Sequence, residues 1–478
     1  MAEKSSATKR RTNMKNTTKN LAIIGGGPAG YVGAIRGAQL GANVFLFEKE
    51  EVGGTCLNVG CIPTKVLTSA AHTFSMFKRA DQVGLKISDV SLDLPQLMRK
   101  KQATVRKLVT GVKYLLKSNG VNLINGTAKF LDRNTIEIEK KDKTKEKIRA
   151  DCILIATGSV PIKLPIPGID SPGVIGSTEA LTIEEIPEEF LIIGAGAIGC
   201  EFASIYHTFG SKVTIVEMLP QILPMEDEEI ALDLKRLWEK AGVKIYTGSK
   251  VTQITSGPDG KKIVSIATSE KEIEAKADKI LVSVGRKANL KGLGVENIKL
   301  KLEKGNILVD EYLRTGIPNI YAAGDCIGGY LLAHVASREA EVAVENALGE
   351  NIKMDYLSVP RCTFTYPEIA SVGLTEKEAK EKGIKIQIGK FPFIANGRAL
   401  GENEPEGFVK IISDESGKII GAHIIGNRAT DLIAELTLAI KMKAKAEDII
   451  ETIHAHPTLP EAIREAVLKL EGRPIHIL

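Results

Sequence analysis

The chain has 478 residues, enough for several domains, and its 43% hydrophobic content is ordinary for a globular protein. Six cysteines in so long a chain exclude a disulfide-stabilised scaffold, and no uncharged run is long enough for a membrane span. The net charge of +5 comes from residues 1–20, which carry six basic residues and one acidic residue. We interpret this segment as a disordered basic tail without a targeting signal, and we expect a cytoplasmic protein.

The first predicted element is a short buried strand, 21–24, followed by a G-x-G-x-x-G turn and a helix over 28–40. A second strand then ends at an acid. Glycines let the backbone approach a pyrophosphate at the helix N-terminus, and the acid accepts ribose hydroxyls. The order strand, turn, helix, strand and acid therefore predicts a dinucleotide site, carried by Gly25, Gly27, Gly30 and Glu48.

Two cysteines, Cys56 and Cys61, follow in the glycine-punctuated segment 53–65. In an ideal helix they would be separated by ~7.5 Å along the axis, beyond the ~7 Å limit for a disulfide. We therefore expect an irregular or distorted segment, with a regular helix only after Pro63. Two thiols beside a dinucleotide indicate two-electron transfer between sulfur and a cofactor, and the alternative is a pair of buried structural cysteines.

Residues 91–120 have the pattern of an amphipathic helix, and 121–160 that of short strands with a charged hairpin at 140–147. A buried strand and a tight turn at 153–159 end this region. Several prolines between 161 and 172 predict a linker.

The dinucleotide pattern then recurs. The distance from first glycine to acid is 23 residues in both copies, and Gly210 closes the second helix as Gly41 closes the first. The same spacing in both copies favours two bound dinucleotides, one for each copy. The second acid is followed by Met218 and Leu219 rather than by arginine, which favours NAD over NADP. This second turn comprises Gly194, Gly196, Gly199 and Glu217.

Beyond the second copy, 280–284 is predicted to return the chain to the first domain, and a strand at 319–325 ends at Asp325. This carboxylate either caps a turn or binds a cofactor hydroxyl. From about residue 353, alternating segments predict an antiparallel sheet, flanked by helices at 431–443 and 460–470, without a nucleotide motif.

The cysteine segment, the repeated frames and the C-terminal sequence H-A-H-P-T-L-P-E at 454–461 resemble the pyridine nucleotide-disulfide oxidoreductases over about residues 20–475. The C-terminal motif is similar to that of the branch that oxidises dihydrolipoamide. The resemblance implies an α/β fold with two Rossmann-like domains, for FAD (21–160) and NAD (161–283), a central domain that completes the FAD site (284–352) and an α+β dimer-interface domain (353–478).

The activity implied by this resemblance is oxidation of protein-bound dihydrolipoamide to lipoamide through a redox-active disulfide and FAD, with reduction of NAD⁺ to NADH. Alternatives are a glutathione-type reductase, a mercuric reductase or a non-catalytic complex subunit. Glu217 without basic neighbours disfavours the NADPH-dependent glutathione type, and the absence of cysteine from 363–478 disfavours the mercuric type. The implied partners are a second copy of the chain and a lipoyl-bearing acyltransferase of a 2-oxoacid dehydrogenase complex, or the lipoyl carrier protein of glycine cleavage.

The resemblance also implies residue roles. Cys56 would exchange with the substrate sulfur, Cys61 would face the flavin as a thiolate, and His456 of the partner subunit would be the base, oriented by Glu461. Lys65 and Glu201 would lie near the reactive flavin nitrogen, and Asp325 would hold the ribityl chain. The remaining expected cofactor-binding residues are Thr55, Thr157, Gly158 and Gly285.

The C-terminal motif has a second interpretation. Thr458 and Glu461 have the spacing of a capping box at the start of the last helix, and this role is compatible with orienting His456. The chain departs from the usual family pattern at Thr64 and Pro460, and neither position changes a reacting group.

Overall fold

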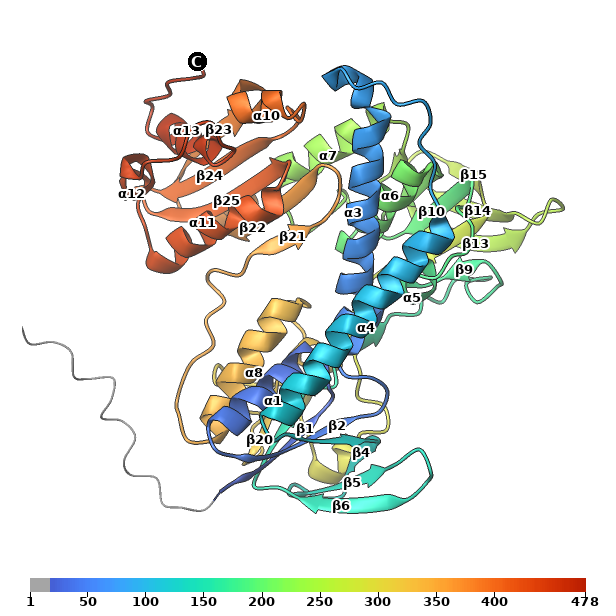
Figure 1. Cartoon of the computed structure of the whole chain (residues 1–478), viewed down its shortest axis with the longest axis vertical. Helices are drawn as coiled ribbons and strands as arrows, with labels where there is room; N and C mark the ends of the chain where they lie inside the picture. The colour runs from blue at the N-terminus through green and yellow to red at the C-terminus, as the bar shows by residue number, and fades with distance from the viewer. Residues whose placement is uncertain (1–17) are drawn as a thin grey trace, which may run out of the picture. The chain divides into compact units, whose positions relative to one another are not determined.

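A computed structural model describes residues 18–478; residues 1–17, most of the predicted basic tail, lie outside this range. The chain forms two compact units, each assembled from three stretches of sequence. Unit 1 comprises, within the described residues, 18–54, 109–159 and 288–354. Unit 2 comprises 55–108, 160–287 and 355–478. Figure 1 labels their elements.

Unit 1 is built on a five-stranded parallel sheet. Helices α1 (Pro28–Gln39) and α8 (Ala333–Ala347) lie side by side against it (Figure 1). The predicted strands, helix and turn of the first dinucleotide fold are confirmed. The strand order is β20 (Ile320–Ala322), β7 (Cys152–Ile155), β1 (Asn20–Ile24), β2 (Asn43–Glu48) and β3 (Asn122–Asn125).

The two faces of this sheet bury alternate residues of β1. An added Cβ on Gly37 of α1 would lie 2.6 Å from Leu21, so this side chain faces the helices. Ala22 and Ile24 instead belong to a buried cluster with Phe130 of the antiparallel sheet, as expected from the period of two in a strand. The second sheet comprises β4 (Thr127–Phe130), β5 (Thr135–Glu139) and β6 (Lys145–Arg149), which confirms the predicted hairpin.

Unit 2 repeats the parallel fold. Its central strand β10 lies between β11 and β16, as β1 lies between β2 and β7, which confirms the predicted repeat. The sheet order is β12 (Lys244–Tyr246), β11 (Lys212–Val216), β10 (Glu189–Ile193), β16 (Lys279–Val282) and β9 (Val174–Ile175). Its other elements are α6 (Ala197–Phe209), α7 (Glu228–Lys240) and an antiparallel sheet of β13 (Lys250–Ser256), β14 (Lys262–Ala267) and β15 (Glu272–Ala277).

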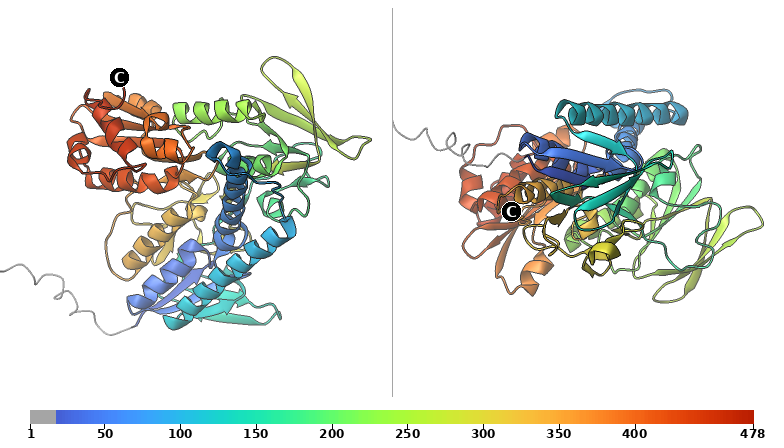
Figure 2. Two further views of the ribbon diagram at one scale, coloured as in Figure 1. Left: turned by 45° about the horizontal axis from the view of Figure 1, so that its top comes forward. Right: turned by 90° about the horizontal axis from the view of Figure 1, so that it is seen from below.

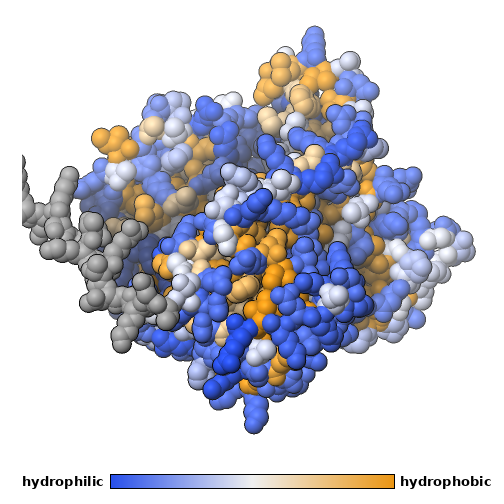
Figure 3. All heavy atoms as spheres, turned by 60° about the horizontal axis from the view of Figure 1, so that its bottom comes forward, coloured by the Kyte–Doolittle hydropathy of each residue, from blue (hydrophilic) through white to orange (hydrophobic). Residues whose placement is uncertain are grey.

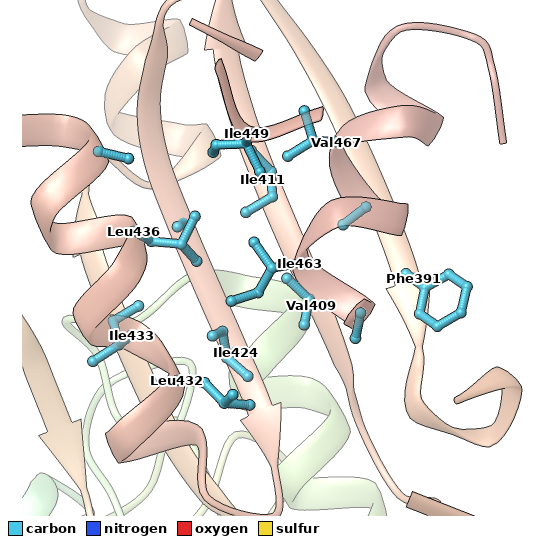
Figure 4. Packing of buried hydrophobic residues seen from close by; sticks show 14 of the residues in the cluster. Phe391, Val409, Ile411, Ile424, Leu432, Ile433, Leu436, Ile449, Ile463 and Val467 are labelled. Carbon is cyan, nitrogen blue, oxygen red and sulfur yellow. The ribbon is translucent and has the colours of Figure 1, made fainter. Parts of the chain in front are cut away.

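The C-terminal part of unit 2 is the predicted antiparallel sheet with helices. In order, its strands are β21 (Arg361–Thr363), β22 (Glu368–Gly373), β25 (Ile419–Gly426), β24 (Phe408–Asp414) and β23 (Ile386–Pro392). Helices α11 (Ala429–Met442) and α13 (Glu461–Leu470) both contact it. Figure 4 shows Leu436 of α11 and Ile463 of α13 directed toward the strand residues Ile411 and Ile424.

Two long helices lie outside the sheets, and the first of them carries residues of the candidate site. Helix α3 (Cys61–Lys78) packs against α6, and α4 (Leu94–Ser118) is one unbroken rod in Figure 2, which confirms the predicted amphipathic helix. No helix within residues 18–478 is long and apolar enough to cross a membrane. On the face drawn in Figure 3, hydrophilic side chains cover most of the surface and hydrophobic ones form patches between them.

Candidate active site

The first glycine-rich turn in unit 1 has no room for side chains at Gly25 and Gly30. Gly25 has φ +104°, which L-residues rarely adopt, and an added Cβ on Gly30 would lie 1.7 Å from the Gly25 carbonyl oxygen. An added Cβ on Gly54 would lie 2.7 Å from Cα of Gly27. The backbone at the start of α1 is therefore open to close approach by a pyrophosphate.

The second turn, in unit 2, has the same construction. Gly194 has φ +98°, and an added Cβ on Gly199 would lie 2.1 Å from the Gly194 carbonyl oxygen. Gly196 is the N-cap of α6, and Gly285, beyond β16, has φ +109°. The helix ends as predicted at Gly210 in a left-handed conformation.

The acids that end the second strands both bind their own turns. Glu48 Oε2 accepts the N–H of Gly26 at 2.7 Å, and Glu217 Oε2 accepts the N–H of Ala195 at 2.6 Å. Both carboxylates are buried. Because a carboxylate has about four acceptor positions, each acid retains capacity for ribose hydroxyls. Sequence reasoning did not anticipate this second task of the acids.

Several polar side chains lie at or after the carboxyl ends of β7 and β20 in unit 1. Asp325 Oδ2 accepts a hydrogen bond from Ser159 Oγ, and buried Glu339 accepts the N–H of the residue before Asp325 at 2.7 Å. Gly158 has φ +67°. The buried Thr157 Oγ1 has no nitrogen or oxygen partner within residues 18–478. A bound polar ligand would satisfy this hydroxyl.

The two cysteines lie on either side of a helix break. Cys56 is in α2 (Gly54–Val59), and Cys61 is the first residue of α3. At Gly60, an added Cβ would lie 2.8 Å from the Thr55 carbonyl oxygen, so only glycine fits without a shift. The expected distortion is therefore present. The regular helix begins at Cys61, two residues before the predicted Pro63, because proline needs no N–H donor in a first turn.

The pKa values of the two cysteines are shifted in opposite directions. The hydrogen bond from Cys56 lowers the pKa of Cys61, desolvation opposes it, and the Lys65 charge adds to the lowering, to about 7. The same hydrogen bond and desolvation raise the pKa of Cys56. In the dithiol form this asymmetry favours Cys61 over Cys56 as the thiolate.

Lys65 lies four residues after Cys61 on α3 and points to α6. Its Nζ is 2.7 Å from both carboxylate oxygens of Glu201. The structure therefore brings together in unit 2 the predicted cysteines, Lys65 and Glu201. The glycine turn of the first fold lies in the other unit.

His456 and Glu461 form a pair on the C-terminal part of unit 2. Nδ1 of His456 is 2.9 Å from Glu461 Oε1, while Oε2 accepts the Thr458 N–H at 2.8 Å. Desolvation raises the pKa of Glu461, but the hydrogen bond from the Thr458 N–H and the interaction with His456 outweigh it. The pKa of Glu461 is therefore below its ordinary value. The His456 side chain is 80% exposed and borders a cavity of 540 Å³.

The capping-box prediction is only half correct. Glu461 does reach back to the Thr458 N–H, but the Thr458 hydroxyl donates to the Ala455 carbonyl instead of capping the helix. Helix α13 starts at Glu461 with Pro460 as its N-cap. Thr458 lies two residues before the N-cap, so its hydroxyl is outside the position from which a side chain caps this helix.

Comparison with known protein families decides the class. The model of the pyridine nucleotide-disulphide oxidoreductases matches residues 19–340, and that of their dimerisation domain matches 359–467. The chain belongs to the pyridine nucleotide-disulphide oxidoreductase family. The predicted family, the fold class and the flavoprotein disulfide oxidoreductase activity are confirmed.

Relatives within this family match nearly the whole chain. The dihydrolipoyl dehydrogenase of Bacillus subtilis is 43% identical over 96% of this chain and 99% of its own length. That of Thermus scotoductus is 45% identical over 96% and 99% of the two chains. The dihydrolipoamide dehydrogenase of Chaetomium thermophilum is 42% identical over 98% and 94%. The crystal structure of LpdA from Mycobacterium tuberculosis superposes with a TM-score of 0.87 at 28% identity, covering 95% of this chain and 100% of that one.

Members of the family use FAD and NAD, which confirms the predicted cofactors. The residues present fit these groups. In unit 1 the glycine turn and the unsatisfied Thr157 hydroxyl suit FAD. In unit 2 the buried Glu217, with no basic side chain at the two following positions, suits NAD rather than a 2′-phosphate.

Three contributors to the site have no signal in the sequence. Ser159 bonds Asp325, Glu339 anchors the turn before it, and Phe364 contacts the Lys65–Glu201 pair. Each lies 15 or more residues from its partner, beyond the reach of the local spacing patterns of a helix or strand.

Proposed function

We propose that this chain oxidises protein-bound dihydrolipoamide to lipoamide through a Cys56–Cys61 disulfide, with FAD and NAD⁺ as acceptors. The predicted dihydrolipoamide dehydrogenase function is confirmed by the relatives, which are named dihydrolipoyl or dihydrolipoamide dehydrogenase at 40–45% identity over nearly the whole chain. The roles of Cys56 and Cys61 and the protein-bound form of the substrate are our proposal. The observation that carries the proposed chemistry is the His456–Glu461 pair, a base with an orienting carboxylate, on the dimerisation domain.

The proposed base acts on the substrate thiol. Alkyl thiols are mostly protonated near neutral pH, and only the thiolate attacks sulfur. Glu461 occupies Nδ1 of His456, which leaves Nε2 as the nitrogen that takes the thiol proton. The exposed position of His456 on a dimerisation domain supports its action in the site of a second copy of the chain.

The proposed exchange begins at Cys56. The substrate thiolate attacks Cys56 Sγ, a substrate–Cys56 disulfide forms, and the Cys56–Cys61 bond breaks with its electron pair on Cys61. The lowered pKa of Cys61 supports this direction, because a sulfur of lower pKa leaves faster. His456 releases the first proton to solvent and then takes the proton of the second substrate thiol. The resulting thiolate attacks the substrate sulfur bonded to Cys56, lipoamide forms, and His456 gives the second proton to the departing Cys56 thiolate.

The Lys65 ammonium stabilises the Cys61 thiolate that this exchange produces. When bound, FAD would supply an acceptor for the electron pair and NAD⁺ would supply the final hydride acceptor. We assign FAD to the domain 21–160, completed by 284–352, with Gly25, Gly27, Gly30 and Glu48 at its pyrophosphate and ribose and Asp325 at its ribityl chain. NAD is assigned to 161–283, with Gly194, Gly196, Gly199 and Glu217.

The proposed physiological substrate is a lipoyl group on the acyltransferase of a 2-oxoacid dehydrogenase complex or on the glycine-cleavage carrier protein. The test is dithiol-dependent NAD⁺ reduction by the purified protein, with free dihydrolipoamide and with a lipoylated domain. Cys56→Ser should abolish this activity and leave FAD bound. Equal activity of Cys56→Ser and the unaltered protein, or reduction of glutathione disulfide with NADPH in place of dihydrolipoamide oxidation, contradicts the proposal.

A further inference from the structure

Phe364 lies directly after β21 and joins the dimerisation domain to the Lys65–Glu201 pair. Its backbone N–H donates to Glu201 Oε1 at 3.0 Å, and Lys65 Nζ lies 4.0 Å from the centre of its ring. One residue thus contacts both members of the pair. The anion is bound by the backbone and the cation by the aromatic face, which attracts an ammonium group.

The segment around Phe364 is itself held firmly against the second dinucleotide fold. The Tyr366 N–H donates to Ser204 Oγ at 3.0 Å, and the Tyr366 carbonyl accepts from Trp238 Nε1 at 3.1 Å. Ser204 lies three residues after Glu201, so the N–H groups of Phe364 and Tyr366 bind the same face of α6. Phe364 is therefore supported by three hydrogen bonds that do not involve Lys65.

Lys65 needs such support because its own stem is flexible. A lysine side chain has many rotamers, and Glu201 alone allows the ammonium to move around the carboxylate. The ring of Phe364 occupies one side of the space around the carboxylate and so limits where the ammonium can move. With both contacts in place, the charge stays on the α3 face that carries Cys61, four residues earlier.

We propose that Phe364 is a positioning residue that holds the Lys65 ammonium at the redox pair and so favours the thiolate form of Cys61. This inference rests on the proposed function of the two cysteines and extends it to a residue of the dimerisation domain. The charged and titratable groups that act on Cys61 are Cys56 of α2, Lys65 of α3 and Glu201 of α6. Phe364 acts through Lys65 and Glu201, both of which it contacts.

The test measures ionisation rather than turnover. In the FAD-loaded Cys56→Ser protein, alkylation of Cys61 by iodoacetamide is followed by peptide mass spectrometry as a function of pH. Phe364→Leu should raise the alkylation midpoint and slow the reaction near pH 7 by about threefold, because the ammonium is less often beside the sulfur. Phe364→Tyr keeps the ring and should restore the original profile.

Phe408→Leu is the matched control. Phe408 is also a half-buried phenylalanine of the dimerisation domain with a lysine, Lys390, 4.9 Å from its ring centre, yet it contacts neither Lys65 nor Glu201 in any described interaction. It should leave the Cys61 profile unchanged. Phe364→Met, a residue of similar bulk without a ring, serves if the leucine variant does not fold.

An unchanged Cys61 midpoint in folded Phe364→Leu or Phe364→Met overturns the proposal, as does an equal shift in Phe408→Leu. Because the assay uses neither dihydrolipoamide nor NAD⁺, a failed substrate assignment would leave its result intact.

Discussion

His456 Nδ1 lies 2.9 Å from Glu461 Oε1, and the other oxygen of the same carboxylate accepts the Thr458 N–H at 2.8 Å. Glu461 is therefore fixed by the backbone of the turn that carries the histidine. The carboxylate cannot rotate without breaking one of these bonds, so the imidazole has a defined orientation. This relationship makes Glu461 both a structural anchor of the turn and the orienting group of the proposed base.

Replacement of Glu461 by glutamine should slow dithiol oxidation. Glutamine keeps the size of the side chain and can still accept the Thr458 N–H, but it removes the negative charge beside the imidazolium. We expect kcat for dihydrolipoamide to fall by up to about 10²-fold, less than the ~10²–10⁴ attributed to a general base itself. NADH oxidation by an artificial electron acceptor, which needs no thiol deprotonation, should be unchanged. Equal loss of both activities would mean that the substitution damages the fold.

The lowered pKa of Glu461 also makes a prediction for stability. A carboxylate whose folded pKa is below its unfolded value stabilises the fold above the unfolded pKa of about 4.3. This contribution is lost as pH falls through the folded pKa. The unaltered protein should therefore unfold at higher urea concentration than Glu461→Gln at pH 7, and the two urea midpoints should converge as the pH falls below the unfolded pKa and through the lower folded pKa. A difference in urea midpoint that stays the same at all these pH values contradicts the lowered pKa of Glu461.

The first glycine turn should not tolerate a methyl group. In Gly30→Ala the new Cβ would meet the Gly25 carbonyl oxygen at 1.7 Å, so the turn must open. We expect the purified protein to lose most of its FAD, measured by visible absorbance. Gly111→Ala is the control, because its Cβ would meet nothing within 4 Å and alanine favours the α4 helix by about 1 kcal/mol. Full FAD occupancy of Gly30→Ala would show that the turn does not bind this cofactor.

Glu217→Gln separates NAD binding from the thiol chemistry. The uncharged amide still reaches the Ala195 N–H but is a weaker acceptor for ribose hydroxyls. KM for NAD⁺ should rise about tenfold, equivalent to about 1.4 kcal/mol. Dihydrolipoamide-dependent reduction of an artificial acceptor should keep its rate. An unchanged KM for NAD⁺ would remove Glu217 from the nucleotide site.

The sequence predicted the parts of this fold that depend on local chemistry. Both glycine turns, their helices and the following acids were located because glycine and a buried strand are needed at fixed spacing. The helix break between Cys56 and Cys61 followed from disulfide geometry, although its position at Gly60 depends on contact with the Thr55 carbonyl. Local patterns did not predict contacts made across long separations, and the Lys65–Glu201 pair was expected only from the family resemblance. Phe364 meets Lys65 only because two sheets pack against α6, and no spacing encodes that approach.

The capping prediction failed for a related reason. Spacing alone made Thr458 a plausible N-cap, but the helix begins at Glu461 with Pro460 as its N-cap, and the Thr458 hydroxyl donates within the preceding turn to the Ala455 carbonyl. Local motifs therefore located the catalytic candidates, and only the folded turn determined which of their hydrogen bonds form.

The central claim is that Cys56 of one subunit receives the substrate sulfur while His456 of the other takes its proton. The most direct test is a heterodimer of one Cys56→Ser subunit and one His456→Ala subunit, purified through two different tags. Each parent homodimer should be nearly inactive with dihydrolipoamide. The heterodimer contains one site with an intact cysteine pair and the partner's intact His456, so it should recover about half of the unaltered activity, the share of one active site in two. A heterodimer that binds FAD, remains dimeric and is no more active than its parents would contradict the account.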